Sequence, residues 1–150
     1  MRRLIQNYCL CTITALGVVI LDLWSKKFWF AREEMWTGLA PLLQTIHHRN
    51  YGLMFNLPAP TWMIVGVSGL VLLAVIVLFG RKLAWWPMAI GLGLLIGGAL
   101  GNGYDRIAFG FVRDWILAFG RSAFNVADIA IGAGLLLLFW YRDKKVDEFV

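Results

Sequence analysis

Four apolar runs of nearly membrane-spanning length constrain this chain more than any other feature of its sequence. They cover residues 4–23, 61–79, 83–100 and 124–141. Each is close to the ~20 residues that an α-helix needs to cross the hydrocarbon core of a bilayer. Only 15% of the residues are charged, whereas soluble domains carry about 25%. We therefore expect an all-α membrane protein with four transmembrane helices and a small interfacial, β-containing loop region outside the membrane, forming a single domain over residues 1–150.

The lengths of the connections predict the topology. Only residues 80–82 separate the second and third runs, so these two helices form an antiparallel hairpin. An even number of spans places both termini on one side of the membrane and the two long connections, residues 24–60 and 101–123, on the other. The first run follows two arginines, as a secretory signal would, but its length and its polar end at Asp22 and Lys26 predict a retained span.

Basic residues do not fix the orientation by number. Each side of the predicted topology carries seven of them. One set is Arg2, Arg3, Arg81, Lys82, Arg142, Lys144 and Lys145, and the other is Lys26, Lys27, Arg32, Arg49, Arg106, Arg113 and Arg121. The density is higher on the side of the termini, which favours cytoplasmic termini. Basic clusters beside apolar runs suit anionic lipid head groups, and we expect no nucleic-acid partner.

Cysteine and histidine do not indicate a metal or a disulfide. Cys9 and Cys11 lie in the first apolar run and point to nearly opposite faces of a helix, so they cannot bridge each other. His47 and His48 are adjacent, without a helical partner at ligand spacing. We interpret this pair as part of an exposed interfacial loop and expect neither a metal nor a cofactor. The aromatic residues of the same connection predict a segment that lies in the membrane interface.

Polar side chains gather at the loop-side ends of three predicted helices. Their spacing of three or four residues places them on shared helix faces: Asp22 with Lys26, Asn102 with Asp105 and Arg106, and Asn125 with Asp128. Asp128 falls about four residues, or roughly 6 Å, inside its predicted span. An ionisable group at that depth is costly unless water or a partner meets it, so a functional site is the default interpretation.

The segment Gly110–Ile116 alternates in polarity as a short strand does. Asp114 then faces away from Arg113, and its loop must return to Asp128, so the two carboxylates can meet. Two adjacent carboxyl groups cannot both ionise easily. One can take a proton from water while the other donates to a carbonyl oxygen, which is the arrangement of an aspartic protease. From the residues alone, a structural pair that locks the loop to the helix is equally open.

Four motifs resemble those of bacterial lipoprotein signal peptidases, also called signal peptidase II. DLWSK at 22–26 resembles the D-x-x-[ST]-K element, and NYGLMF at 50–55 resembles N-x-G-x-x-F. GGALGNGYDR at 97–106, followed by GFVRD at 110–114, resembles GGALGN-x-x-DR…G-x-V-x-D. FNVAD at 124–128 resembles FN-[VI]-AD. The motifs occur in family order and cover nearly the whole chain.

The resemblance implies an aspartic endopeptidase of the bacterial cytoplasmic membrane. Such enzymes remove signal peptides from diacylglyceryl-modified prolipoproteins by cutting before the lipidated cysteine, near the outer membrane surface. The catalytic pair carries onto Asp114 and Asp128. The substrate-binding or supporting positions are Asp22, Lys26, Asn50, Gly52, Asn102, Asp105, Arg106 and Asn125. The termini are then cytoplasmic, the partners are prolipoproteins and membrane lipids, and we expect a monomer.

We also expect particular roles for the individual supporting residues. We expect Asp105 and Arg106 to form a local charge pair that shapes the pocket. Asp22 and Lys26 are expected at the rim of the site, either as a structural pair or in contact with substrate. Asn50 holds either the loop or the peptide backbone. Gly52 and Gly110 serve backbone conformations.

Some positions depart from the family pattern. Leu53 and Met54 replace small residues, Trp115 replaces a common Phe, and Gly103 and Tyr104 replace an apolar pair. We expect these changes to affect lipid or peptide preference more than the chemistry.

Two other functions stay open at this level. A small proton or solute transporter would place acids along the depth of its spans. A non-catalytic paralogue would bind lipidated peptides without cleaving them.

Overall fold

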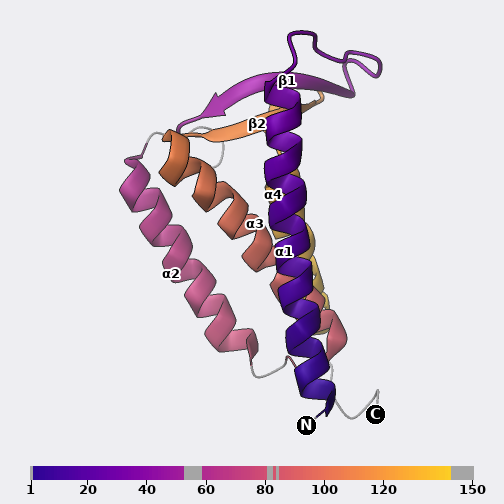
Figure 1. The fold of residues 1–150 in the computed structure, drawn as a ribbon, viewed down its shortest axis with the longest axis vertical. Helices are drawn as coiled ribbons and strands as arrows, with labels where there is room; N and C mark the ends of the chain where they lie inside the picture. The colour runs from indigo at the N-terminus through magenta and orange to yellow at the C-terminus, as the bar shows by residue number, and fades with distance from the viewer. Residues whose placement is uncertain (1, 53–58, 81–82, 84, 143–150) are drawn as a thin grey trace.

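The computed structural model describes residues 2–52, 59–80, 83 and 85–142. This part of the chain is mostly helical, with a small sheet across one end of the helices and the N-terminal end of α1 at the other (Figure 1). In chain order the elements are α1 (Arg2–Phe30), β1 (Leu43–Asn50), α2 (Thr61–Phe79), α3 (Trp86–Phe109), β2 (Val112–Ala118), β3 (Ser122–Phe124) and α4 (Val126–Tyr141).

The helices extend further toward the sheet than hydropathy predicts. α1 continues to Phe30 and α3 to Phe109, whereas the apolar runs end at residues 23 and 100. The polar residues that end each run are bound to partners inside the protein, so the helix continues through them. α3 then ends at Gly110, whose φ of 79° is the left-handed conformation that closes many helices.

The start of α4 corrects one prediction about depth. The helix begins at Val126, and Asn125 is its N-cap residue, with its side chain accepting a hydrogen bond from the backbone of Asp128. Asp128 is therefore the third residue of the helix, and it lies closer to the helix start than the sequence predicted.

Glycines let α3 pack closely against two helices at once. A Cβ atom added to Gly93 would lie 2.6 Å from the carbonyl oxygen of Cys11 in α1, and Gly97 approaches α1 in the same way. A Cβ atom added to Gly98 would lie 2.5 Å from the carbonyl oxygen of Ala127 in α4. Such stripes of small residues are the usual means of helix association in lipid, and Gly93 and Gly97 form a stripe of this kind against α1.

The three strands form an antiparallel sheet with β2 in the centre. Val112, Asp114 and Ile116 of β2 are buried, which confirms the predicted alternation. The predicted loop position of His47 and His48 is wrong, because both lie in β1, where His48 pairs with Asp114 in the register. Neither β1 nor β3 was predicted as a strand.

The outer surfaces of the helices are strongly apolar. Ile20 of α1, Leu78 of α2 and Leu136 of α4 are 67%, 70% and 73% exposed. Contiguous apolar surface of this kind suits contact with lipid rather than with water. Of the described helices, α1 and α2 are long and apolar enough to cross a membrane, and α4 is a shorter apolar helix.

Candidate active site

Asn125 joins the two aspartates that the sequence singled out. Its side-chain Nδ2 donates to Oδ1 of Asp114 at 2.7 Å. Its Oδ1 accepts from the backbone N–H of Asp128 at 3.0 Å, and its own N–H donates to Oδ2 of Asp128 at 3.2 Å. The last two bonds form a capping box at the start of α4. One N-cap residue thus fixes a strand carboxylate and a helix carboxylate beside each other.

Asp114 is the buried member of this pair. It lies on the inward face of β2 and is 1% exposed. Nδ2 of Asn50, at the end of β1, donates to its Oδ2 at 3.1 Å. Burial, and then the negative charge of Asp128, raise the pKa of Asp114 to about 6, although the hydrogen bonds from Asn125 and Asn50 oppose the shift.

Asp128 is the open member of the pair. It is exposed on the protein surface while Asn125 beside it is fully buried. Its Oδ1 accepts a hydrogen bond from Nδ2 of Asn102 in α3 at 2.8 Å. Asp114, which readily holds a proton, therefore lies beside Asp128, which an incoming substrate can reach.

A buried cluster of charges lies behind the pair. The Nζ atom of Lys26 is 2.7 Å from Oδ2 of Asp22 and 3.3 Å from Oδ2 of Asp105, and all three side chains are fully buried. Arg113 binds the other side of Asp105, with Nη2 2.6 Å from Oδ1. The alternating cations and carboxylates supply the partners that buried charges need.

Asp22 also ties α1 to the start of α4. Its Oδ1 accepts the backbone N–H of Ala127 at 2.9 Å, which is one of the N–H groups that a helix start leaves without an internal partner. Its Oδ2 fits against Gly101 of α3, where a Cβ atom would lie only 2.5 Å away. The predicted pairing of Asp22 with Lys26 is confirmed, but their predicted place at the rim is wrong, because both are fully buried.

In place of the predicted pair, Asp105 and Arg106 each bind other partners. Asp105 pairs with Lys26 and Arg113, and Nη2 of Arg106 donates to the carbonyl oxygen of Gly52 at 3.2 Å. Adjacent helix residues point in different directions, so Asp105 faces the cluster while Arg106 reaches the chain that follows β1. Leu53 and Met54, which follow Gly52, lie outside the described residues.

Sequence reasoning missed two roles at this site. Arg113 was placed in a motif but not among the site residues, although the strand alternation that turns it away from Asp114 also turns it toward Asp105. Asn50 holds the loop, as expected, by accepting the backbone N–H of Gly52 at 3.0 Å, but its direct hydrogen bond to Asp114 was not predicted. Its place depends on the pairing of β1 with β2, which the sequence did not reveal.

Serine and metal chemistry find little support among the described residues. Oγ of Ser25 donates to the backbone carbonyl of Asp22 at 2.9 Å and is buried, so its hydroxyl is occupied by the helix. The described residues contain no group of three or more His, Cys, Asp or Glu placed to hold a metal ion. Cys9 and Cys11 are free thiols.

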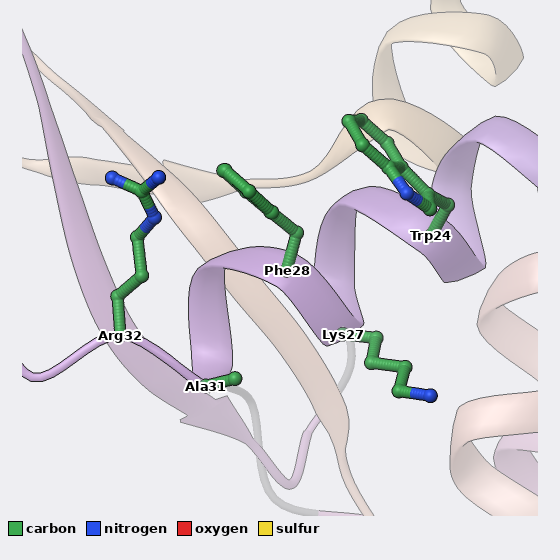
Figure 2. Close-up of a pocket in the computed structure, with 5 residues that line it drawn as sticks. All are labelled: Trp24, Lys27, Phe28, Ala31 and Arg32. Atoms are coloured by element: carbon green, nitrogen blue, oxygen red, sulfur yellow. The ribbon is translucent and has the colours of Figure 1, made fainter.

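A surface groove of about 440 Å³ lies on the outer side of α1, away from the carboxylates. It is lined by Trp24, Lys27, Phe28, Ala31 and Arg32, and the rings of Trp24 and Phe28 stack 5.3 Å apart (Figure 2). Arg32 covers Phe28 at 4.2 Å from the ring centroid. Trp24 and Phe28 each lie two positions from Lys26, so they face the opposite side of the helix from the charge cluster.

Comparison with known proteins identifies the family. The signal peptidase (SPase) II family model matches residues 14–142. The lipoprotein signal peptidase of Halalkalibacterium halodurans is 33% identical over 146 residues, covering 89% of this chain and 92% of that protein. That of Pseudomonas fluorescens is 34% identical over 155 residues, covering 91% and 89%.

A solved structure shares the fold. A bacterial membrane enzyme determined by the in meso method at 2.3 Å resolution superposes with a TM-score of 0.78 at 25% identity and covers 93% of each chain. The resemblance carried by the four sequence motifs is thereby confirmed, and the chain belongs to the signal peptidase II family.

Proposed function

We propose that this protein is a signal peptidase II, an aspartic endopeptidase that removes signal peptides from diacylglyceryl-modified prolipoproteins by cutting before the lipidated cysteine. Family membership supports the reaction. The observation that carries the site is Asn125, which binds the carboxyl of Asp114 and caps the helix that bears Asp128. Asp114 and Asp128 are the catalytic residues, and a water held between them is the nucleophile.

The chemistry follows from two carboxyl groups that differ in protonation. The ionised one removes a proton from the water, whose oxygen attacks the scissile carbonyl carbon, while the neutral one gives its proton to the carbonyl oxygen. The tetrahedral intermediate then collapses. The C–N bond breaks, the first carboxyl delivers its proton to the leaving nitrogen, and the second recovers its own. The products are a signal peptide with a new carboxylate and a lipoprotein with a free amino group on its cysteine.

The supporting residues act by holding these two groups. Asn125, Asn50 and Asn102 supply hydrogen bonds to the carboxylates. The cluster of Asp22, Lys26, Asp105 and Arg113 joins α1, α3, β2 and α4 behind them. Arg106 anchors Gly52 beside the site.

The membrane placement is part of the proposal. α1, α2, α3 and α4 are four spans of a single domain covering residues 1–150, with the sheet at the outer face and both termini in the cytoplasm. The apolar outer surfaces of the helices support this arrangement. So does the sheet, which lies across one end of them (Figure 1). The protein is then a monomer of the bacterial inner membrane.

The acids do not suit a transporter. Asp22, Asp105, Asp114 and Asp128 gather where the helices meet the sheet, linked directly or through Lys26 and the amides of Asn102 and Asn125. A proton relay would need such groups along the depth of the spans. A non-catalytic paralogue would bind lipidated substrate, and only an activity assay separates it from the peptidase.

The test is cleavage of a diacylated prolipoprotein by purified protein in detergent, with the unlipidated precursor as substrate control. We expect Asp114→Asn and Asp128→Asn each to lose at least ~10²–10⁴-fold in kcat, the usual contribution of a general acid or base. Glu33→Gln, an exposed position after α1, is the matched control and should cleave like the wild type. Near wild-type cleavage by either aspartate variant contradicts the site, and an inactive wild type that still binds substrate contradicts the reaction.

A further inference from the structure

Lys26 is connected to the catalytic pair through one intervening side chain, that of Asn102. Its Nζ atom is surrounded by Oδ2 of Asp22 at 2.7 Å, Oδ1 of Asn102 at 3.0 Å and Oδ2 of Asp105 at 3.3 Å. An ammonium group has three N–H donors and no acceptor. These three oxygens therefore match its hydrogen-bonding capacity, and the side chain is fully buried.

The charge of Lys26 decides which way the Asn102 amide points. With Oδ1 toward the ammonium, Nδ2 faces Oδ1 of Asp128 at 2.8 Å. The flipped amide would place its NH2 group against the ammonium and its carbonyl oxygen against the carboxylate. Both contacts would be repulsive, because they set donor against donor and acceptor against acceptor. The cation on one side and the anion on the other thus select a single orientation.

This orientation adds to other features that favour negative charge on Asp128. Its Oδ2 accepts the backbone N–H of Asn125 at 3.2 Å, and it lies in the first turn of α4, at the positive end of the helix dipole. Asp128 is exposed whereas Asp114 is buried. Burial disfavours the charged form of Asp114.

We propose that Lys26 is a positioning residue that holds the NH2 group of Asn102 toward Asp128, and that Asp128 is consequently the general base and Asp114 the general acid. The inference rests on the proposed function and assigns its two roles. Asp128 takes the proton from water and later gives it to the leaving nitrogen. Asp114 lends its proton to the carbonyl oxygen and recovers it when the intermediate collapses.

A double-mutant cycle tests whether Lys26 acts through Asn102. Lys26→Met leaves Asp22 without its cation, so the cycle is run in an Asp22→Asn background, where adding Lys26→Met restores the net charge of the wild-type cluster. In that background we expect Lys26→Met and Asn102→Leu each to lower kcat at least tenfold, with KM changed less than threefold. The double variant should be no slower than the slower single variant.

The pH profile supplies a readout that loss of folding would not produce. The NH2 group of Asn102 stabilises the charge that the general base must carry, so without this donor the acid limb of kcat/KM should move to higher pH. The shift should be equal in the Lys26 variant, the Asn102 variant and their combination. Thermal unfolding in detergent and binding of uncleaved substrate select the variants that are folded.

Lys27→Met is the matched control, because Lys27 is exposed and lines the groove on the outer side of α1 (Figure 2). It should keep wild-type kcat. The positioning role would be overturned if the kcat losses of the two single variants multiplied in the double variant, or if the Lys26 variant left the acid limb of kcat/KM in place. That result would leave the proposed function standing, since wild-type cleavage and the aspartate variants test it separately.

Discussion

The substitution Gly101→Ala tests how rigidly the buried charge cluster of Asp22, Lys26, Asp105 and Arg113 is held. The new Cβ atom would lie 2.5 Å from Oδ2 and 3.2 Å from Cγ of Asp22, well inside ordinary van der Waals contact. The carboxylate cannot retreat freely, because it is fully buried between Nζ of Lys26 and the backbone N–H of Ala127. Either the α1–α3 contact opens or Asp22 gives up one of these partners.

The two outcomes bracket the expected loss of stability. Overpacking with retained partners costs about 1–3 kcal/mol, and breaking a buried ion pair costs about 3–5 kcal/mol. Gly101→Ala should therefore lower the free energy of unfolding by ~1–5 kcal/mol. It should also lower kcat, since displacement of Asp22 moves Lys26 and, through Asn102, Asp128.

Gly103→Ala is the matched control on the same helix. No heavy atom lies within 4 Å of a Cβ atom built there, and alanine is favoured over glycine in helices by about 1 kcal/mol. It should unfold at the same temperature as the wild type or slightly above it. Thermal unfolding of both variants in one detergent makes the comparison. Equal melting temperatures would refute the claim that Gly101 is required by the carboxylate of Asp22.

Four further outcomes follow from the site. Because burial and the charge of Asp128 raise the pKa of Asp114 to about 6, kcat/KM should fall about tenfold per pH unit above about pH 6, as a pH–rate profile would show. The same raised pKa means that Asp114 stabilises the fold fully below about pH 4 and that this contribution is lost as the pH rises through about 6, measurable as a falling melting temperature. Asn50→Leu removes a donor to the ionised form of Asp114, so the alkaline limb should move up by about one pH unit. Arg113→Met leaves Asp105 with Lys26 as its remaining ion-pair partner, which should lower the free energy of unfolding by ~3 kcal/mol in a denaturant titration.

Local spacing predicted what neighbouring residues of one element determine. The pairing of Asp22 with Lys26 follows from a separation of four residues on a helix, and the burial of Asp114 follows from alternation along a strand. The approach of Asp114 to Asp128 was also predictable, because a short loop must return to the next helix. Each of these inferences needs only the period of the helix or strand.

Contacts between elements far apart in the sequence could not be predicted in this way. Lys26 and Asn102 are separated by 76 residues, and nothing in either segment indicates which helix faces which. Asn50 reaches Asp114 because β1 pairs with β2, and β1 carries a bulge between Thr45 and His48 that simple alternation does not show. The rim position assigned to Asp22 and Lys26 was wrong because charge suggested water, whereas the buried charges are bound to one another.

The same polar residues explain why hydropathy describes α3 poorly. The helix has 24 residues, enough to cross a bilayer, but the apolar run predicted for it ends at Leu100 because its last turns are polar. Its glycines allow α1 and α4 to approach closely. The last turns carry Asn102 and Asp105, which both contact the buried ammonium of Lys26, and Asn102 also binds the carboxylate of Asp128. A helix that contributes to a site in a membrane enzyme is thus only partly recognisable as a span, since a site needs the polar groups that lipid excludes.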